Sequence, residues 1–230
     1  MKHVRKLSLL LCLAMLASLV LTGCGSKEKP APPNESAEAI FLMAIKNDPS
    51  KAVEVFGFAS ESEAKTELMG SDEDPYKEVG EELVSQFEAL GATVSSEDAQ
   101  ALIDAVLSML GKLQYSAEVK DMDEKAGTAV VTSHIGHYDA VAVQNAMTDA
   151  MTDVMTNNPD LANDTDAFVS AMIQKMAEVM SSMQPVEGTK DFDTEFTLEK
   201  VTVSGKEKEV WIPVDANGFG GDLANAAMGG

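Results

Sequence analysis

The chain changes its hydrophobic period at Leu113-Gln114-Tyr115-Ser116-Ala117-Glu118-Val119-Lys120. Apolar and polar residues alternate through this stretch, which is typical of a β-strand with one buried face. A turn-forming segment follows at Asp121–Gly127, and the next run, Thr128–Tyr138, is rich in β-branched residues. The sequence therefore predicts two consecutive antiparallel strands in the middle of the chain.

Before these strands, apolar residues recur every three to four positions, which predicts a series of helices. Their starts are marked by capping residues or by proline. Ser60 with Glu63 and Ser95 with Asp98 have the spacing of N-terminal caps. The predicted helices begin at Asn34 (as the N-cap), Asp48-Pro49, Ser60, Asp74-Pro75 and Ser95.

After the two strands, the helical period returns over Asp139–Gln184 and predicts a helical hairpin. Strand character resumes from Phe192 to Val203, with a phase shift at Glu199-Lys200 that predicts a β-bulge. A closing strand is predicted at Val210–Val214, and one helical turn at Leu223–Ala227. The order predicts an α+β fold: N-terminal helices packed on a curved antiparallel sheet of about four strands, with a Met-rich helical hairpin inserted.

The N-terminus has the order of a secretory signal: basic residues, then an apolar run, then small residues before a cysteine. The apolar run, Leu7–Leu21, is shorter than the roughly 20 residues that a membrane span needs. Leu21-Thr22-Gly23-Cys24 resembles the lipobox of bacterial lipoproteins. The resemblance implies a cleaved signal peptide over 1–23 and a diacylglyceryl group on Cys24. We therefore expect a lipid anchor on the extracytoplasmic face of the cell membrane.

Residue composition excludes several functions. Without 1–23 the chain keeps 14 lysines, no arginine and all 38 acidic residues, a net charge of −24. Such a surface repels phosphates, so nucleic acid is excluded as a partner. Because Cys12 lies in the signal and Cys24 is the lipidation candidate, the remaining body has no thiol for a disulfide, for catalysis or for zinc.

The segment 24–33 contains Pro30, Pro32 and Pro33 and is predicted to be an extended tether. At about 3.1 Å per residue, it holds the body up to roughly 30 Å from the lipid. The remainder, 34–230, is predicted to be a single α+β domain with an insertion at about 139–184. Gly25 follows the cysteine, which resembles the pattern for outer-membrane sorting in cells with two membranes.

The order of these features resembles a family of lipoproteins. The lipobox, the helical pack, the strand Ala129-Val130-Val131-Thr132 and the closing Val210-Trp211-Ile212-Pro213-Val214 carry the resemblance. It is to functionally uncharacterised bacterial lipoproteins with a nuclear-transport-factor-2-like (cystatin-like) domain. That resemblance implies a sheet that curls around a helix and leaves an apolar pocket, a frame that hosts both enzymes and binding modules.

Two histidines, His134 and His137, remain in the mature chain. Residues three apart on a regular strand point to opposite faces, so these two cannot jointly bind a metal without a bulge. His137 and Asp139 could share a face, which would permit a general base with an orienting carboxylate. The competing interpretation places both histidines at a solvent-exposed strand end, and we expect no catalytic residue, no metal and no cofactor.

Methionines recur at helical spacing on both halves of the predicted hairpin. Thioether side chains fill irregular cores, line pliant apolar grooves or bind Cu(I). Core packing is the simplest interpretation, and a groove is the functional alternative. The candidate groove residues are Met147, Met151, Met155, Met172, Met176 and Met180.

Together these features predict a lipid-anchored extracytoplasmic binding or interaction module without catalytic activity. Its expected partners are the membrane, through Cys24, and an apolar small molecule or a protein. One alternative is a cone-fold hydrolase or isomerase that uses His137 and Asp139. Another is the solute-binding lipoprotein of a transporter, which the shortness of the chain and the lack of alternating strand–helix units disfavour.

Overall fold

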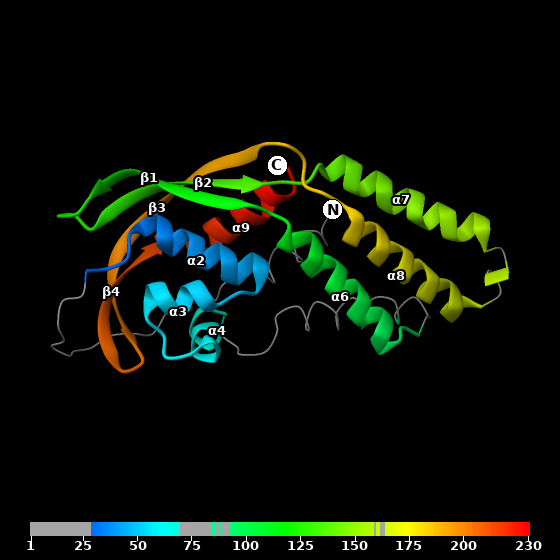
Figure 1. Cartoon of the computed structure of the whole chain (residues 1–230), viewed down its shortest axis with the longest axis horizontal. Coiled ribbons are helices and arrows are strands. Elements are labelled where there is room, and N and C mark those ends of the chain that lie inside the picture. The colour runs from blue at the N-terminus through cyan, green and yellow to red at the C-terminus, as the bar shows by residue number, and fades with distance from the viewer. Residues whose placement is uncertain (1–28, 70–83, 86–87, 89–92, 159, 162–163) are drawn as a thin grey trace. The chain divides into compact units, whose positions relative to one another are not determined.

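The computed structural model describes residues 29–69, 84–85, 88, 93–158, 160–161 and 164–230. The predicted region 34–230 contains two compact units (Figure 1). Unit 1 comprises the described residues of Met1–Glu73, Gln114–His137 and Glu187–Gly230. Unit 2 comprises those of Asp74–Leu113 and Tyr138–Val186. The predicted helix from Asp74 to Gly91 lies almost wholly outside the described residues.

Unit 1 is built on a four-stranded antiparallel sheet in the order β1-β2-β3-β4. The strands are β1 (Tyr115–Asp123), β2 (Thr128–Gly136), β3 (Thr189–Val203) and β4 (Lys206–Pro213). β2 and β3 are neighbours in the sheet although α7 and α8 lie between them in the sequence. The sheet is open, with β1 and β4 at its edges, and the predicted α+β class with about four antiparallel strands is confirmed.

Two helices cover the same face of β1–β3. α2 (Pro33–Lys46) places Phe41 parallel to Tyr115, with ring centroids 4.3 Å apart. α9 (Ala216–Ala227) brings Phe219 to 5.9 Å from Phe196. Because directly paired residues of antiparallel strands share a face, the register places Tyr115 and Phe196 on one side of the sheet. The opposite side of these strands carries polar residues.

Several helix boundaries differ from the predicted ones. α2 begins at Pro33 with Pro32 as its N-cap, so Asn34 lies in the first turn and is not the cap. Proline suits this position because its missing N–H is unpaired in a first turn anyway. α9 spans twelve residues where one turn was predicted, because Asp215 accepts from Gly218 N and starts the helix earlier, within a glycine-rich segment. α3 (Ser50–Phe56) and α4 (Glu61–Met69) complete unit 1.

The predicted bulge at Glu199-Lys200 is wrong. β3 pairs with β4 without a shift from Phe196 to Val203, whereas the register shift in the sheet lies between Val119 and Asp121 of β1. The change of phase that motivated the prediction is nevertheless present in the burial. Thr194 and Phe196 are buried on one face of β3, and Val201 and Val203 are buried on the other. The strand thus changes its buried face without an extra residue.

The helices of unit 2 that the structure describes in full are α6 (Ser96–Gly111), α7 (Ala140–Asn157) and α8 (Thr165–Ser182). α8 packs against both α6 and α7. Leu102 of α6 and Ile173 of α8 belong to its core, and Tyr138 donates a 2.7 Å hydrogen bond to the Met109 carbonyl. Ser95 caps α6 through Asp98 N, as predicted, and Asp98 in turn accepts from Gln174 of α8 at 3.0 Å.

Candidate functional site

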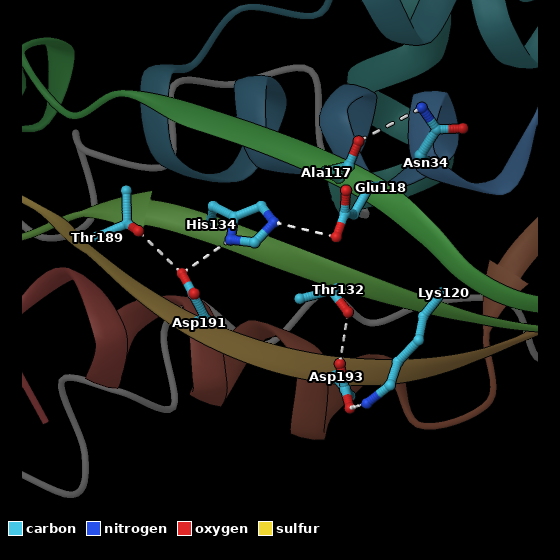
Figure 2. A network of polar contacts seen from close by, with 9 residues as sticks. All are labelled: Asn34, Ala117, Glu118, Lys120, Thr132, His134, Thr189, Asp191 and Asp193. Carbon is cyan, nitrogen blue, oxygen red and sulfur yellow. Dashed lines mark hydrogen bonds and ion pairs between the residues drawn. The ribbon is translucent and has the colours of Figure 1, made fainter.

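The polar side of β1–β3 carries two neighbouring sets of charged and hydroxyl side chains (Figure 2). His134 of β2 lies opposite Asp191 of β3, with 2.9 Å between Nδ1 and Oδ1. Its other ring nitrogen, Nε2, lies 3.9 Å from Glu118 Oε1 of β1. Thr189 donates to the same Asp191 oxygen at 2.9 Å. One imidazole therefore bridges carboxylates from the two strands that flank its own.

A second set lies beside the first. Thr132 of β2 donates a 2.6 Å hydrogen bond to Asp193 of β3, and Lys120 of β1 forms an ion pair with the same carboxylate. The register places Thr132 directly opposite Asp193, just as His134 is opposite Asp191. Asp191 and Asp193 are thus each held by a cationic or ionisable group of a neighbouring strand and by a hydroxyl, which comes from Thr189 of β3 itself for Asp191 and from Thr132 of β2 for Asp193.

These contacts shift the acidic groups in a consistent direction. The hydrogen bond from His134 lowers the pKa of Asp191, with a further contribution from Thr189. The pKa of Asp193 is lowered mainly by its contact with Lys120, then by Thr132. Both carboxylates are therefore held in the ionised form, because their hydrogen-bond donors favour the charged state.

The His134–Asp191 pair has the first two members of a general-base arrangement, an imidazole and an orienting carboxylate. The third member would be a hydroxyl next to the other ring nitrogen, Nε2. Nε2 faces Glu118 instead, and the neighbouring hydroxyl, that of Thr189, donates to Asp191. Asp191 and Glu118 are also largely exposed. The geometry ties three strands together on an exposed face of the sheet.

The predicted pair His137 and Asp139 is placed differently. Asp139 is the N-cap of α7, and its Oδ1 accepts from the backbone N–H groups of Val141 and Ala142. His137 follows β2, and its Nδ1 is buried without a hydrogen-bond partner. The two residues belong to different units. The carboxylate of Asp139 therefore caps α7.

Unit 1 also contains an apolar pocket between its N-terminal helices and the β3–β4 hairpin. The cavity volume is about 30 Å³, and Glu67 and Thr202 are its polar lining residues. A small-molecule site usually has about 300–1,000 Å³, so this pocket accepts a group the size of a side-chain tip. Its apolar lining consists of Ile40, Phe56, Phe58, Leu68, Val201, Val203, Val210 and Ile212.

The methionines of the candidate groove fall into two groups. Met180 packs against the core of unit 2, and Met147, Met172 and Met176 are partly buried. Met151 and Met155 of α7 are exposed, at 43% and 63% of their surface, and Val141 of the same helix at 64%. The set is therefore mixed: part of it belongs to the packing of the helices, and two members form an exposed edge of α7.

Cys24, the predicted lipidation site, lies outside the described residues. Within the described ranges, no helix has the length and apolarity that a membrane crossing requires. The same part of the chain contains no group of three or more His, Cys, Asp or Glu side chains placed to hold a metal ion.

Comparison with known proteins gives one informative similarity. No family model and no curated protein matches the chain. A crystal structure described as a "putative lipoprotein (ycdA)" from Bacillus subtilis subsp. subtilis str. 168 is similar, with a TM-score of 0.55 and 14% sequence identity. The similarity covers 84% of this chain and 56% of that protein, so this chain spans little more than half of its length. At this identity the similarity shows a shared fold alone.

Proposed function

We propose that the protein is a lipid-anchored module of the extracytoplasmic membrane face that binds a partner and does not catalyse a reaction. Two observations support the anchor: the Leu21-Thr22-Gly23-Cys24 motif, and a fold shared with a protein described as a lipoprotein. In this proposal Cys24 is the first residue of the mature chain and carries the diacylglyceryl group.

The apolar pocket of unit 1 is the observation that carries the binding function. Its lining is almost entirely apolar, and an apolar concavity of this kind favours an apolar occupant. A cavity of about 30 Å³ has room for roughly one water-sized group. The occupant is therefore the end of one apolar side chain of a partner protein, of the kind that anchors many interfaces.

The finer fold assignment, a nuclear-transport-factor-2-like cone with an inserted Met-rich hairpin, belongs to the same proposal. An apolar pocket between helices and a sheet is what that resemblance implies, and the pocket of unit 1 supports it. The order of the elements, with α7 and α8 between β2 and β3 in the sequence, also supports it.

The exposed edge of α7 is a second candidate surface. Val141, Met151 and Met155 place flexible apolar side chains in solvent, and methionine adapts to differently shaped partners. Unlike the pocket, this edge is convex helix surface, so it would bind by contact area without an inserted anchor.

A peptide-display selection distinguishes the two surfaces. We expect random peptides selected on the mature body to share a single Leu, Ile or Phe. Their binding should fall about ten-fold in Ile212→Glu, since a buried charge costs more than the roughly 1.4 kcal/mol that ten-fold requires. The matched control is Met155→Glu, an equally drastic change at the exposed edge, which should leave binding unchanged. Loss of binding in Met155→Glu alone would move the function to α7, and selection of no peptides at all would contradict the proposed binding function.

A further inference from the structure

The chain that leads into α2 runs along the edge strand of the sheet. Asn34 Nδ2 donates to the Ala117 carbonyl in the first part of β1, at 3.5 Å. Five residues earlier, Lys29 Nζ lies 4.0 Å from Glu124 Oε1, in the turn that follows β1. From Asn34 back to Lys29, the chain therefore advances along β1 toward the β1–β2 turn.

This course shortens the free part of the tether. The sequence predicted an extended tether of about 30 Å between the lipid and the domain. Because Lys29 already lies beside the β1–β2 turn, only the five residue steps from Cys24 to Lys29 separate the lipidated residue from the folded body. Fully extended, five steps span at most about 18 Å.

We infer that the β1–β2 turn, residues 123–127, is the end of unit 1 that is held next to the lipid surface. The inference rests on the proposed lipid anchor at Cys24. The opposite end of these strands, where Gly136 pairs with Thr189, lies eight residue steps along β2 from Thr128, or roughly 26 Å away. A body attached at one end by so short a tether keeps that end closer to the bilayer on average.

The chemistry of the turn determines what kind of lipid contact it makes. Asp121, Asp123 and Glu124 are exposed, and Lys125 is the basic residue of the turn. Asp123 also accepts from the backbone N–H groups of Lys125 and Ala126, which fixes the turn. Exposed carboxylates repel anionic headgroups within a Debye length, about 8 Å at physiological salt. The turn therefore faces the bilayer at close range without adhering to anionic lipid.

Site-specific quenching tests the orientation. Since Cys24 is the one cysteine that remains after residue 23 and its thiol would carry the lipid, an introduced cysteine can be labelled alone. Ala126→Cys places a fluorophore in the β1–β2 turn, and Glu187→Cys places one at the far end of unit 1. The full lipidated protein is reconstituted in phosphatidylcholine vesicles that contain a headgroup spin-labelled lipid. We expect quenching at position 126 to exceed that at position 187 by about two-fold or more.

Two further arms separate the outcomes. Ten Gly-Ser residues inserted after Gly25 should remove most of the difference between the two labels, because a longer tether frees the orientation. Equal quenching at both positions in the original protein, or stronger quenching at 187, would overturn the inference while leaving the anchor intact. If the protein floats with vesicles no better than Cys24→Ser does, the anchor itself is refuted, and the inference falls with it.

Discussion

His134 and Asp191 form a hydrogen-bonded pair at directly opposed positions of β2 and β3, 2.9 Å apart. The pair belongs to strands that are separated in the sequence by α7 and α8. It therefore reports on the pairing of β2 with β3, and the lowered pKa of Asp191 gives a solution test of that pairing.

Replacing Asp191 with asparagine should change the pH dependence of stability. The pKa of Asp191 is lowered in the folded protein, chiefly by the hydrogen bond from His134. A carboxyl with a depressed folded pKa stabilises the fold above its unfolded value, about 3.9, and this contribution is lost as pH falls through the folded pKa. Asp191→Asn should thus be slightly less stable than wild type at pH 6. The free energy of unfolding should fall by less than about 1 kcal/mol, because the group is exposed. The two proteins should converge once the pH has fallen below the folded pKa of Asp191. If the difference in melting temperature between the two proteins does not change with pH, the pair contributes nothing to the pH dependence of stability.

Tyr138→Phe should destabilise unit 2. The Tyr138 hydroxyl is buried and donates 2.7 Å to the Met109 carbonyl at the end of α6. The carbonyl would still accept from Lys112 N at 3.2 Å, so the loss of the tyrosine hydroxyl should cost about 0.5–1.5 kcal/mol, the net value of one hydrogen bond. Hydrogen exchange followed by mass spectrometry should show faster exchange in α6, while β2–β3 serves as the internal reference. Unchanged exchange in α6 would mean that water replaces the hydroxyl.

Gly57→Ala and Gly205→Ala should cost about the same. Both glycines have a left-handed backbone, with φ of 78° and 75°, so each substitution strains the chain by about 1–2 kcal/mol. At Gly57 the new Cβ would also lie 1.8 Å from Lys208 Nζ, but that atom is the end of a flexible side chain that can move aside, whereas nothing lies within 4 Å at Gly205. Thermal melts of the two variants compare their stabilities. A larger loss in Gly57→Ala that disappears when Lys208→Ala is added would contradict this expectation and show that Lys208 is held in place.

Cys24→Ser should abolish lipidation, since the thiol of Cys24 is the acceptor in the proposed reaction. Intact-mass analysis of the wild-type protein should show the mature chain plus a diacylglyceryl group. The serine variant should appear as uncleaved precursor or as unmodified protein. A wild-type mass without lipid, or a variant that stays as firmly membrane-bound as the wild type, would contradict the anchor.

Local sequence patterns predicted the elements but not the relations between them. The alternation at Tyr115–Lys120 predicts β1, and the spacing around Ser95 and Ser60 predicts their capping hydrogen bonds. Both predictions are confirmed, because these signals arise within a few residues. The His134–Asp191 pair could not be predicted, because it depends on which strands become neighbours and in what register. His137 and Asp139 are closer in the sequence, but Asp139 caps the N-terminus of α7 and its carboxylate accepts from backbone N–H groups there.

The methionine pattern shows a second limit. Spacing of three to four residues marks a helical stripe, but Met180 and Met155 carry the same signal while one packs on the core and the other is exposed. Which edge of a stripe is covered depends on the helix that packs there. For the same reason the pocket of unit 1, whose lining comes from α2, α4, β3 and β4 among others, had no local signature.

The change of buried face along β3 protects the sheet against slippage. A slip of one residue would turn Phe196 toward solvent and, at the same time, bring Val201 and Val203 out of their apolar surroundings. Opposite sides of one strand are thus anchored in succession, so a pairing with β2 or β4 that is shifted by one residue would satisfy neither half. Misregistered hairpins often seed aggregation in open sheets. In this strand a misregistered pairing would expose apolar side chains from both halves, Phe196 from one and Val201 and Val203 from the other.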